Sequence, residues 1–126
     1  MSSGIFFQGY RHDGTNGLIE YVLESCVQDF DRVDVDRARP ALREFFRLSH
    51  QGFYSGLYVF LDDELVREPK DATFLADLFE RVFARLQQPG SELTEMGRVM
   101  VATNLMPLVE RLRRYAEGIL PRVTEA

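Results

Sequence analysis

The residues able to do chemistry are few, because the chain of 126 residues holds two histidines and one cysteine. Arg11, His12 and Asp13 are consecutive in a glycine-rich segment, where they would form a general acid beside a cationic clamp. The alternative is a polar loop in which the aspartate caps a turn. Ser49 and His50 are also neighbours, but consecutive residues on a helix point about 100° apart, which does not suit a nucleophile and its base.

Motifs for cofactors and metals are absent from the sequence. No glycine-rich phosphate loop, no Gly-x-Ser-x-Gly turn and no pair of histidines or cysteines with the spacing of metal ligands occurs. The acidic segment from Asp29 to Asp36 resembles a calcium loop, yet it lacks the central glycine and the terminal glutamate of such a loop. We therefore expect no catalytic residue, no metal and no cofactor, and we do not expect an enzyme.

The composition is that of one folded domain. Hydrophobic residues make up 45% of the chain, and 20 acidic against 15 basic residues give a formal charge of −5. This charge argues against binding to nucleic acids or anionic membranes and permits a basic partner. No run of about 18 apolar residues is present, and the first residues lack the pattern of a signal peptide, so we predict a single cytoplasmic domain at 1–126.

The longest amphipathic pattern lies between Asp71 and Leu86. Its apolar residues recur at helical spacing and form one stripe: Phe74, Leu75, Leu78, Phe79, Val82, Phe83 and Leu86. Burying these side chains is worth roughly 10–20 kcal/mol before chain entropy is subtracted, so this helix is expected to be the centre of the core.

Three further segments show helical patterns. The first runs from 18 to about 30, with Thr15 or Asn16 as its cap and with Cys26 on the apolar stripe as a small buried residue. The second can be capped by Asp36 and has a proline in its first turn. The third begins after 91 and meets Pro107, which either separates two helices or kinks a single one that ends near 118.

Three segments are less regular. Residues 4–10 are rich in β-formers and predict a short strand or an extended arm. Residues 11–17 predict a loop, because glycine, threonine and asparagine are frequent there. Residues 53–65 fit a helical face, which we favour, although 57–61 could also be a strand that enters a hairpin. The sequence therefore predicts a mainly α fold, a single-domain bundle of five or six short helices with a short N-terminal strand or hairpin as an option.

Charged residues are grouped by sign along the chain. Six acidic residues between Glu20 and Asp36 accompany one arginine, and seven acidic residues between Asp62 and Glu80 accompany two basic residues. Arginines gather instead at 37–47 and 111–114. Blocks of one sign would steer an oppositely charged partner toward the protein. The alternative is that the acidic and basic blocks pair with each other across the fold.

A family resemblance rests on two acidic segments, Asp-Phe-Asp-Arg-Val-Asp-Val-Asp at 29–36 and Phe-Tyr-Ser-Gly-Leu-Tyr-Val-Phe-Leu-Asp-Asp-Glu at 53–64. In these segments the chain resembles, in type, the small acidic immunity proteins that bacteria encode beside contact-dependent or polymorphic toxins. The resemblance implies an acidic surface that docks on the basic active-site cleft of a toxin, often a nuclease, and blocks the entry of substrate.

The predicted function is that of an immunity protein that binds and neutralises a cognate toxin, which we expect to be basic. The residues expected to mimic phosphates or to anchor the contact are Asp31, Asp34, Asp36, Tyr54, Tyr58, Asp62, Asp63 and Glu64. The alternative is a small helical regulatory or ligand-binding domain, which could be dimeric. An enzyme that uses His12 or His50 as its acid or base is a third hypothesis.

Overall fold

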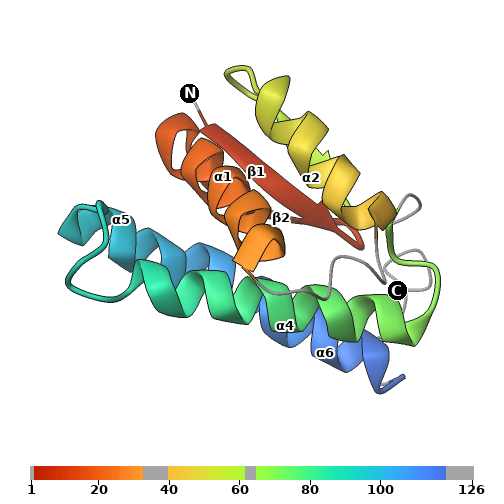
Figure 1. The fold of residues 1–126 in the computed structure, drawn as a ribbon. Coiled ribbons are helices and arrows are strands. Elements are labelled where there is room, and N and C mark those ends of the chain that lie inside the picture. The colour runs from red at the N-terminus through yellow and green to blue at the C-terminus, as the bar shows by residue number, and fades with distance from the viewer. Residues whose placement is uncertain (1, 33–39, 62–64, 119–126) are drawn as a thin grey trace.

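The computed structural model describes residues 2–32, 40–61 and 65–118, and in these residues the chain is mainly α, as predicted. Helices surround one small sheet (Figure 1). Within the same ranges, every helix is too short or too polar to cross a membrane.

The described residues form a three-stranded sheet in the order β2-β1-β3. Strands β1 (Ser2–Phe7) and β2 (Tyr10–Thr15) make an antiparallel hairpin. The two turn residues, Gln8 and Gly9, have φ angles of 51° and 82°, as a type I′ turn requires. The predicted N-terminal strand is confirmed, but the loop predicted for 11–17 is wrong, because every residue of β2 has a partner in β1 and this pairing outweighs local composition.

The third strand, β3 (Tyr58–Phe60), is parallel to β1. The backbone N–H of Gly4 donates to the carbonyl of Leu57 at 3.1 Å, and that of Leu61 donates to the carbonyl of Phe6 at 3.0 Å. The edges of the sheet are therefore β2 on one side and β3 on the other.

The segment 53–65 differs from the helix that its sequence favours. A short apolar run fits both the helical and the extended period, and here the long-range pairing with β1 selects the extended form at 58–60. Gly56, at a φ angle of 89°, turns the chain toward the strand in a conformation that suits glycine. The strand alternative is correct at 58–60, but the strand pairs in parallel with β1 and not in a hairpin.

Helices α1 (Asn16–Arg32) and α2 (Pro40–Gln51) follow the hairpin. Thr15, one of the two predicted caps, accepts a hydrogen bond at its hydroxyl from the N–H of Leu18 at 3.2 Å. Cys26 is fully buried on α1, which confirms its prediction as a small core residue, and burial raises the pKa of its thiol. The cap predicted for α2, Asp36, lies outside the described residues.

The last helical part is continuous: α5 (Glu95–Met100), the π-helical turn η2 (Val101–Leu105) and α6 (Met106–Ala116). Pro107 lies in the first turn of α6, directly after the π-helical turn, and has no backbone N–H to donate within this continuous helical part. The single-helix alternative is thus correct, with a π-helical turn ahead of the proline. We count these three segments as one helix. Together with α1, α2 and α4, the described residues then contain four helices, fewer than the five or six predicted.

Helix α4 (Pro69–Leu86) is the centre of the core, as predicted. It crosses the whole molecule in Figure 1, with α6 alongside it and with α1 and the sheet above it. Its predicted stripe is buried from Leu75 to Leu86, and Phe74 packs at the edge of the core. Aromatic rings connect the helices, since Phe46 of α2 contacts both Phe30 of α1 and Phe79 of α4.

Candidate functional site

The predicted partner-binding residues are only partly within the described ranges. Residues outside these ranges are Asp34, Asp36, Asp62, Asp63 and Glu64. Asp31 belongs to α1, but its side chain is also outside the described part of the protein. Tyr54 and Tyr58 can be placed, and they lie near the same edge of the sheet.

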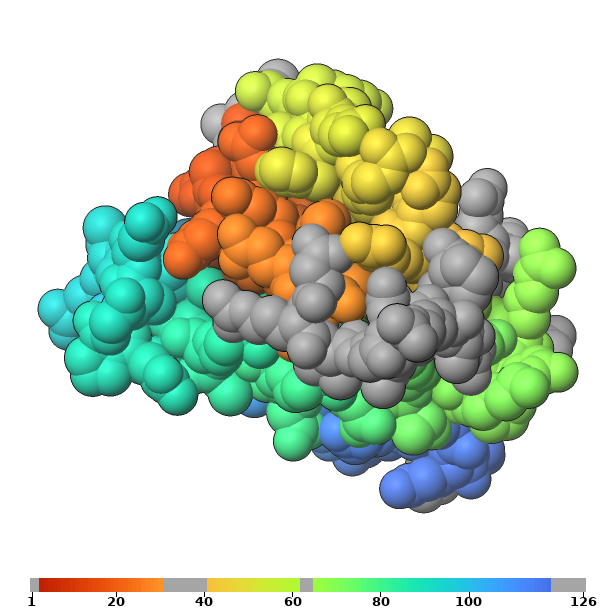
Figure 2. Space-filling model, in the orientation of Figure 1, coloured from red at the N-terminus to blue at the C-terminus, as the bar shows by residue number. Residues whose placement is uncertain are grey.

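Tyr58 lines an open groove of about 430 Å³ between α2 and β3, which we call the α2–β3 groove. The lining is mostly apolar: Phe45, Leu48, Ser49, Gly52, Leu57, Tyr58, Val59 and Phe60. Figure 2 shows α2, in yellow, and the following segment, in yellow-green, at the surface of the molecule. The guanidinium of Arg11 lies 5.9 Å from the centre of the Tyr58 ring, so a cation borders this aromatic side chain.

Large apolar side chains are exposed around the α2–β3 groove. Leu48 of α2 and Phe60 of β3 are each 54% exposed, and Tyr54, between the two elements, is 63% exposed. Side chains alternate between the two faces of a strand, and this explains the exposure of Phe60, since its neighbour Val59 points into the core. Leu48 and Phe60 were missed by the sequence analysis, and the outward phase of Phe60 follows only once the segment is known to be a strand.

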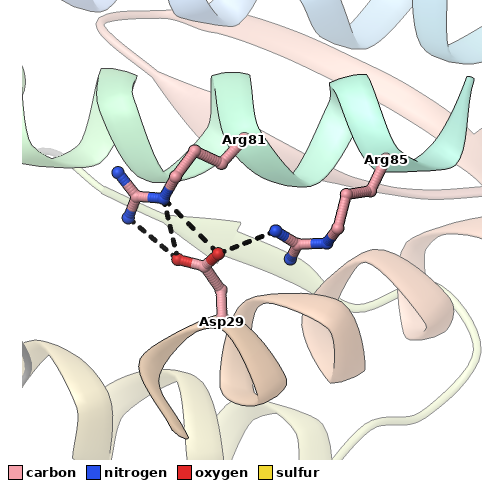
Figure 3. Close-up of polar contacts among 3 residues, drawn as sticks. All are labelled: Asp29, Arg81 and Arg85. Carbon is pink, nitrogen blue, oxygen red and sulfur yellow. Dashed lines mark hydrogen bonds and ion pairs between the residues drawn. The ribbon is translucent and has the colours of Figure 1, made fainter. Parts of the chain in front are cut away.

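Asp29, which belongs to the first acidic block, is buried and paired (Figure 3). Its carboxylate accepts hydrogen bonds from Arg81 at 2.8 Å and from Arg85 at 2.9 Å. Both arginines belong to α4, so this network joins α1 to the central helix. A carboxylate that is removed from water requires such partners, and its role here is structural.

Arg113 makes a second link between charged blocks. Its guanidinium donates to Asp77 at 3.0 Å and to Glu80 at 2.6 Å, which joins α6 to α4. The acidic block at 62–80 therefore meets the basic block at 111–114 across the fold. For these residues the predicted separation of charge is wrong and the pairing alternative is correct, because two packed helices bring the blocks together.

The predicted cluster of Arg11, His12 and Asp13 does not converge. Because all three lie on β2, successive side chains point to opposite faces of the sheet. Arg11 leans over Tyr58, whereas His12 is buried and contacts the π-helical turn through Asn104. An acid beside a cationic clamp is therefore not formed by these three side chains.

His12 belongs instead to a polar pocket of about 290 Å³ between β2 and η2, which we call the β2–η2 pocket. Its lining residues are Tyr10, Arg11, His12, Asp13, Thr103, Asn104, Pro107 and Arg111. Nδ1 of His12 lies 3.0 Å from the carbonyl oxygen of Asn104, and the side-chain amide of Asn104 donates to the carbonyl of Asp13 at 3.1 Å. Asn104 therefore ties the edge of the sheet to the π-helical turn.

The protonation of His12 follows from these contacts. A carbonyl oxygen only accepts, so Nδ1 carries a hydrogen and Nε2 of the neutral ring is an acceptor. Burial lowers the pKa of His12 below its ordinary 6.5, and the nearby Arg111 adds to this, against the opposing effects of the Asn104 hydrogen bond and Asp13. The lowered pKa favours the neutral imidazole.

Asn104 and Arg111 were not identified from the sequence. The guanidinium carbon of Arg111 lies 3.4 Å from the centre of the Tyr10 ring, a close cation–π contact. Tyr10 and Arg111 are about a hundred positions apart in the chain, and local sequence patterns carry no information on such a contact. The one available signal was Pro107, since a proline inside an apolar stripe marks an irregular helix, and such turns occur often at functional sites.

Within the described ranges, no group of three or more histidine, cysteine or acidic side chains is arranged to hold a metal ion. Comparisons of the chain with protein-family models, curated proteins and solved structures found no match. What the α2–β3 groove and the β2–η2 pocket can do must therefore be inferred from their own geometry.

Proposed function

We propose that this chain acts by binding another protein at the α2–β3 groove. The observation that carries the proposal is an apolar groove in whose lining the side chains of Leu48 and Phe60 are exposed. Single exposed apolar residues are common on protein surfaces, but contiguous apolar patches mark interaction sites. Aromatic side chains that enter a partner's pocket also contribute a large share of the binding energy in protein interfaces.

The specific partner that we propose is a basic toxin, which the chain would neutralise as an immunity protein. The net charge of −5 favours a basic partner. In the sequence, Asp62, Asp63 and Glu64 begin one residue after the strand that borders the groove. Apolar anchors combined with carboxylates would suit a cleft that normally binds phosphates. Because Asp29, Asp77 and Glu80 are paired with arginines of the same molecule, we assign the attraction to the acids that come after β3 in the sequence.

The first test is capture of a partner from the cells that naturally make this protein. Three proteins are compared: the unaltered chain, Phe60→Asp in the groove, and Met96→Asp as a control on α5, where Met96 is 72% exposed. Both variants place one new charge at an exposed position, so circular dichroism should show an unchanged fold. We expect the unaltered chain and the control to retain one basic partner that Phe60→Asp loses, with affinity reduced about thirtyfold or more.

The second test uses the purified partner. Titration with the chain should abolish the toxic activity of the partner, and binding should weaken as salt is raised. Binding that is unaffected by Phe60→Asp would refute the groove as the interface. A bound partner that keeps its activity would leave protein binding in place and refute the immunity role. A stable dimer that binds no other protein would favour the alternative, a small regulatory domain.

A further inference from the structure

The residues that line the β2–η2 pocket carry three buried polar atoms that lack a hydrogen-bond partner among the described residues. They are Nε2 of His12, Nε of Arg111 and Oδ1 of Asp13. Buried polar atoms in folded proteins almost always have a partner, so unmet atoms gathered at one pocket indicate that something polar binds there. The arginine atom is a donor with a positive charge, whereas the histidine nitrogen and the carboxylate oxygen are acceptors. A ligand that suits all three must therefore both accept and donate hydrogen bonds.

The donor side of the pocket suits an anion. Arg111 carries a positive charge, and its contact with the Tyr10 ring at 3.4 Å holds the guanidinium in place. The edge of β2 supplies backbone donors as well. The backbone groups of Gly4 and Phe6 in β1 form hydrogen bonds toward β3, so these two residues do not bond to β2. Their partners in β2, Asp13 and Arg11, therefore direct their own backbone N–H and C=O groups away from β1. The hydrogen bond from Asn104 to the Asp13 carbonyl agrees with this direction.

The acceptor side of the pocket selects among anions. Since Nδ1 of His12 donates to the carbonyl of Asn104, Nε2 presents a lone pair. An anion without hydrogen, such as sulfate at neutral pH, would place its own lone pairs against Nε2. An anion that carries a hydroxyl group can instead donate its hydrogen to Nε2 while its other oxygens accept from Arg111.

We propose that the β2–η2 pocket binds a small oxyanion that carries a hydroxyl hydrogen, with free hydrogen phosphate as the simplest case. In this site Arg111 and the backbone N–H of Arg11 hold the charged oxygens, and the hydroxyl group donates to Nε2 of His12. The pocket is at the β2 edge of the sheet, and the α2–β3 groove is at the opposite edge. The two sites share one neighbour, because Arg11 lines the pocket and its guanidinium lies over Tyr58 of the groove. Phosphate binding and partner binding are measured separately, so either proposal can fail without the other.

Calorimetric titration with inorganic phosphate and with sulfate, at pH 7 and equal ionic strength, tests the proposal on the unaltered chain. We expect phosphate to bind, and sulfate to bind at least about tenfold more weakly, because it cannot donate to Nε2. Nitrogen NMR should show that phosphate changes the Nε2 resonance of His12 and the backbone amides of Arg11 and Asp13. Equal affinity for the two anions, absence of phosphate binding, or changes confined to other residues would overturn the site.

A pair of arginine variants then tests the donor. Arg111→Gln removes the charge in the pocket and should weaken phosphate binding by about one to two orders of magnitude. Arg114→Gln is the matched control, since Arg114 lies on the same helix, is 56% exposed and pairs with Glu110. The control should keep the affinity of the unaltered chain. An equal effect of the two substitutions would mean that net charge, and not the pocket, attracts the anion.

Discussion

The carboxylate of Asp29 accepts hydrogen bonds from both Nε and Nη2 of Arg81. Nη2 lies 2.8 Å from Oδ2, and Nε is shared between Oδ2 at 3.1 Å and Oδ1 at 3.4 Å. Arg85 adds a hydrogen bond to Oδ1 at 2.9 Å. The carboxylate is 1% exposed, whereas the two arginine side chains are 37% and 33% exposed. Water can therefore solvate the arginines when the carboxylate is lost, but it cannot reach the carboxylate when the arginines are lost. The two halves of this network should respond differently to mutation.

Removing both arginines should destabilise the protein more than neutralising the acid. The double variant Arg81→Met/Arg85→Met leaves a buried charge without a partner and should cost about 3–5 kcal/mol. Asp29→Asn keeps one acceptor and leaves two arginines that water can reach, so about 1–3 kcal/mol is expected. Unfolding in urea measures both. Arg47→Met, which breaks the exposed pair with Glu44, is the control and should leave the stability unchanged. The opposite order for the first two variants would contradict this account.

Gly4 is expected to be essential for the packing of the outer strands. A Cβ atom at this position would lie 2.7 Å from the carbonyl oxygen of His12 and 2.9 Å from Cε1 of Tyr58. Gly4→Ala should therefore lower the unfolding free energy by about 1–3 kcal/mol. Gly17→Ala is the matched control, because a Cβ there meets nothing within 4 Å and alanine favours the helix by up to about 1 kcal/mol. Thermal unfolding should move in opposite directions for the two variants, and a shared direction would argue against the crowding at Gly4.

The part of the fold that could be predicted is the part that local periodicity specifies. The stripe from Leu75 to Leu86 buries one face of α4 over several turns, so the sequence alone identifies the central helix. The sheet is different, because β1 has partners on both sides and one of them, β3, is more than fifty residues away. Pairing of this kind depends on the assembled fold, so β2 resembled a loop and β3 resembled a helix.

Stability is expected to depend on pH through His12. Burial lowers its pKa in the folded state below the 6.5 of the unfolded chain, so below about pH 6.5 the unfolded state binds more protons. The free energy of unfolding should thus be highest above pH 6.5 and should fall as the pH drops through this value, by up to about 1.4 kcal/mol per pH unit. Two charged groups near the ring also affect the pKa of His12: Arg111 lowers it and Asp13 raises it.

Urea unfolding between pH 7.5 and about 5.5 measures this dependence, a window above the range in which carboxylates titrate. His12→Gln should lose the slope, whatever its stability at pH 7.5. His50→Gln changes the only other histidine of the chain and serves as the control. If His12→Gln and the unaltered chain lose stability in parallel, His12 is not the responsible group.

The candidate sites were predicted less well than the core, for a reason that particular residues illustrate. Tyr54 and Tyr58 were selected because aromatic side chains beside acids are conspicuous in a sequence, and of these two Tyr58 lines the α2–β3 groove. The β2–η2 pocket was not found, because its contact between His12 and Asn104 spans 92 positions and depends on a π-helical turn. Residue types can be read locally, whereas the pairing of donors with acceptors requires the packed structure.

The placement of negative charge, more than its amount, should control association with a basic partner. Asp62→Asn/Asp63→Asn and Asp77→Asn/Glu80→Gln remove the same number of charges, but Asp77 and Glu80 already face Arg113. If the acids after β3 steer the partner, the first pair should slow association about tenfold and flatten its dependence on salt. The second pair should change the rate less, since Arg113 already offsets one of these two charges. Stopped-flow association with the captured partner distinguishes these outcomes, and equal effects would show that net charge alone is responsible.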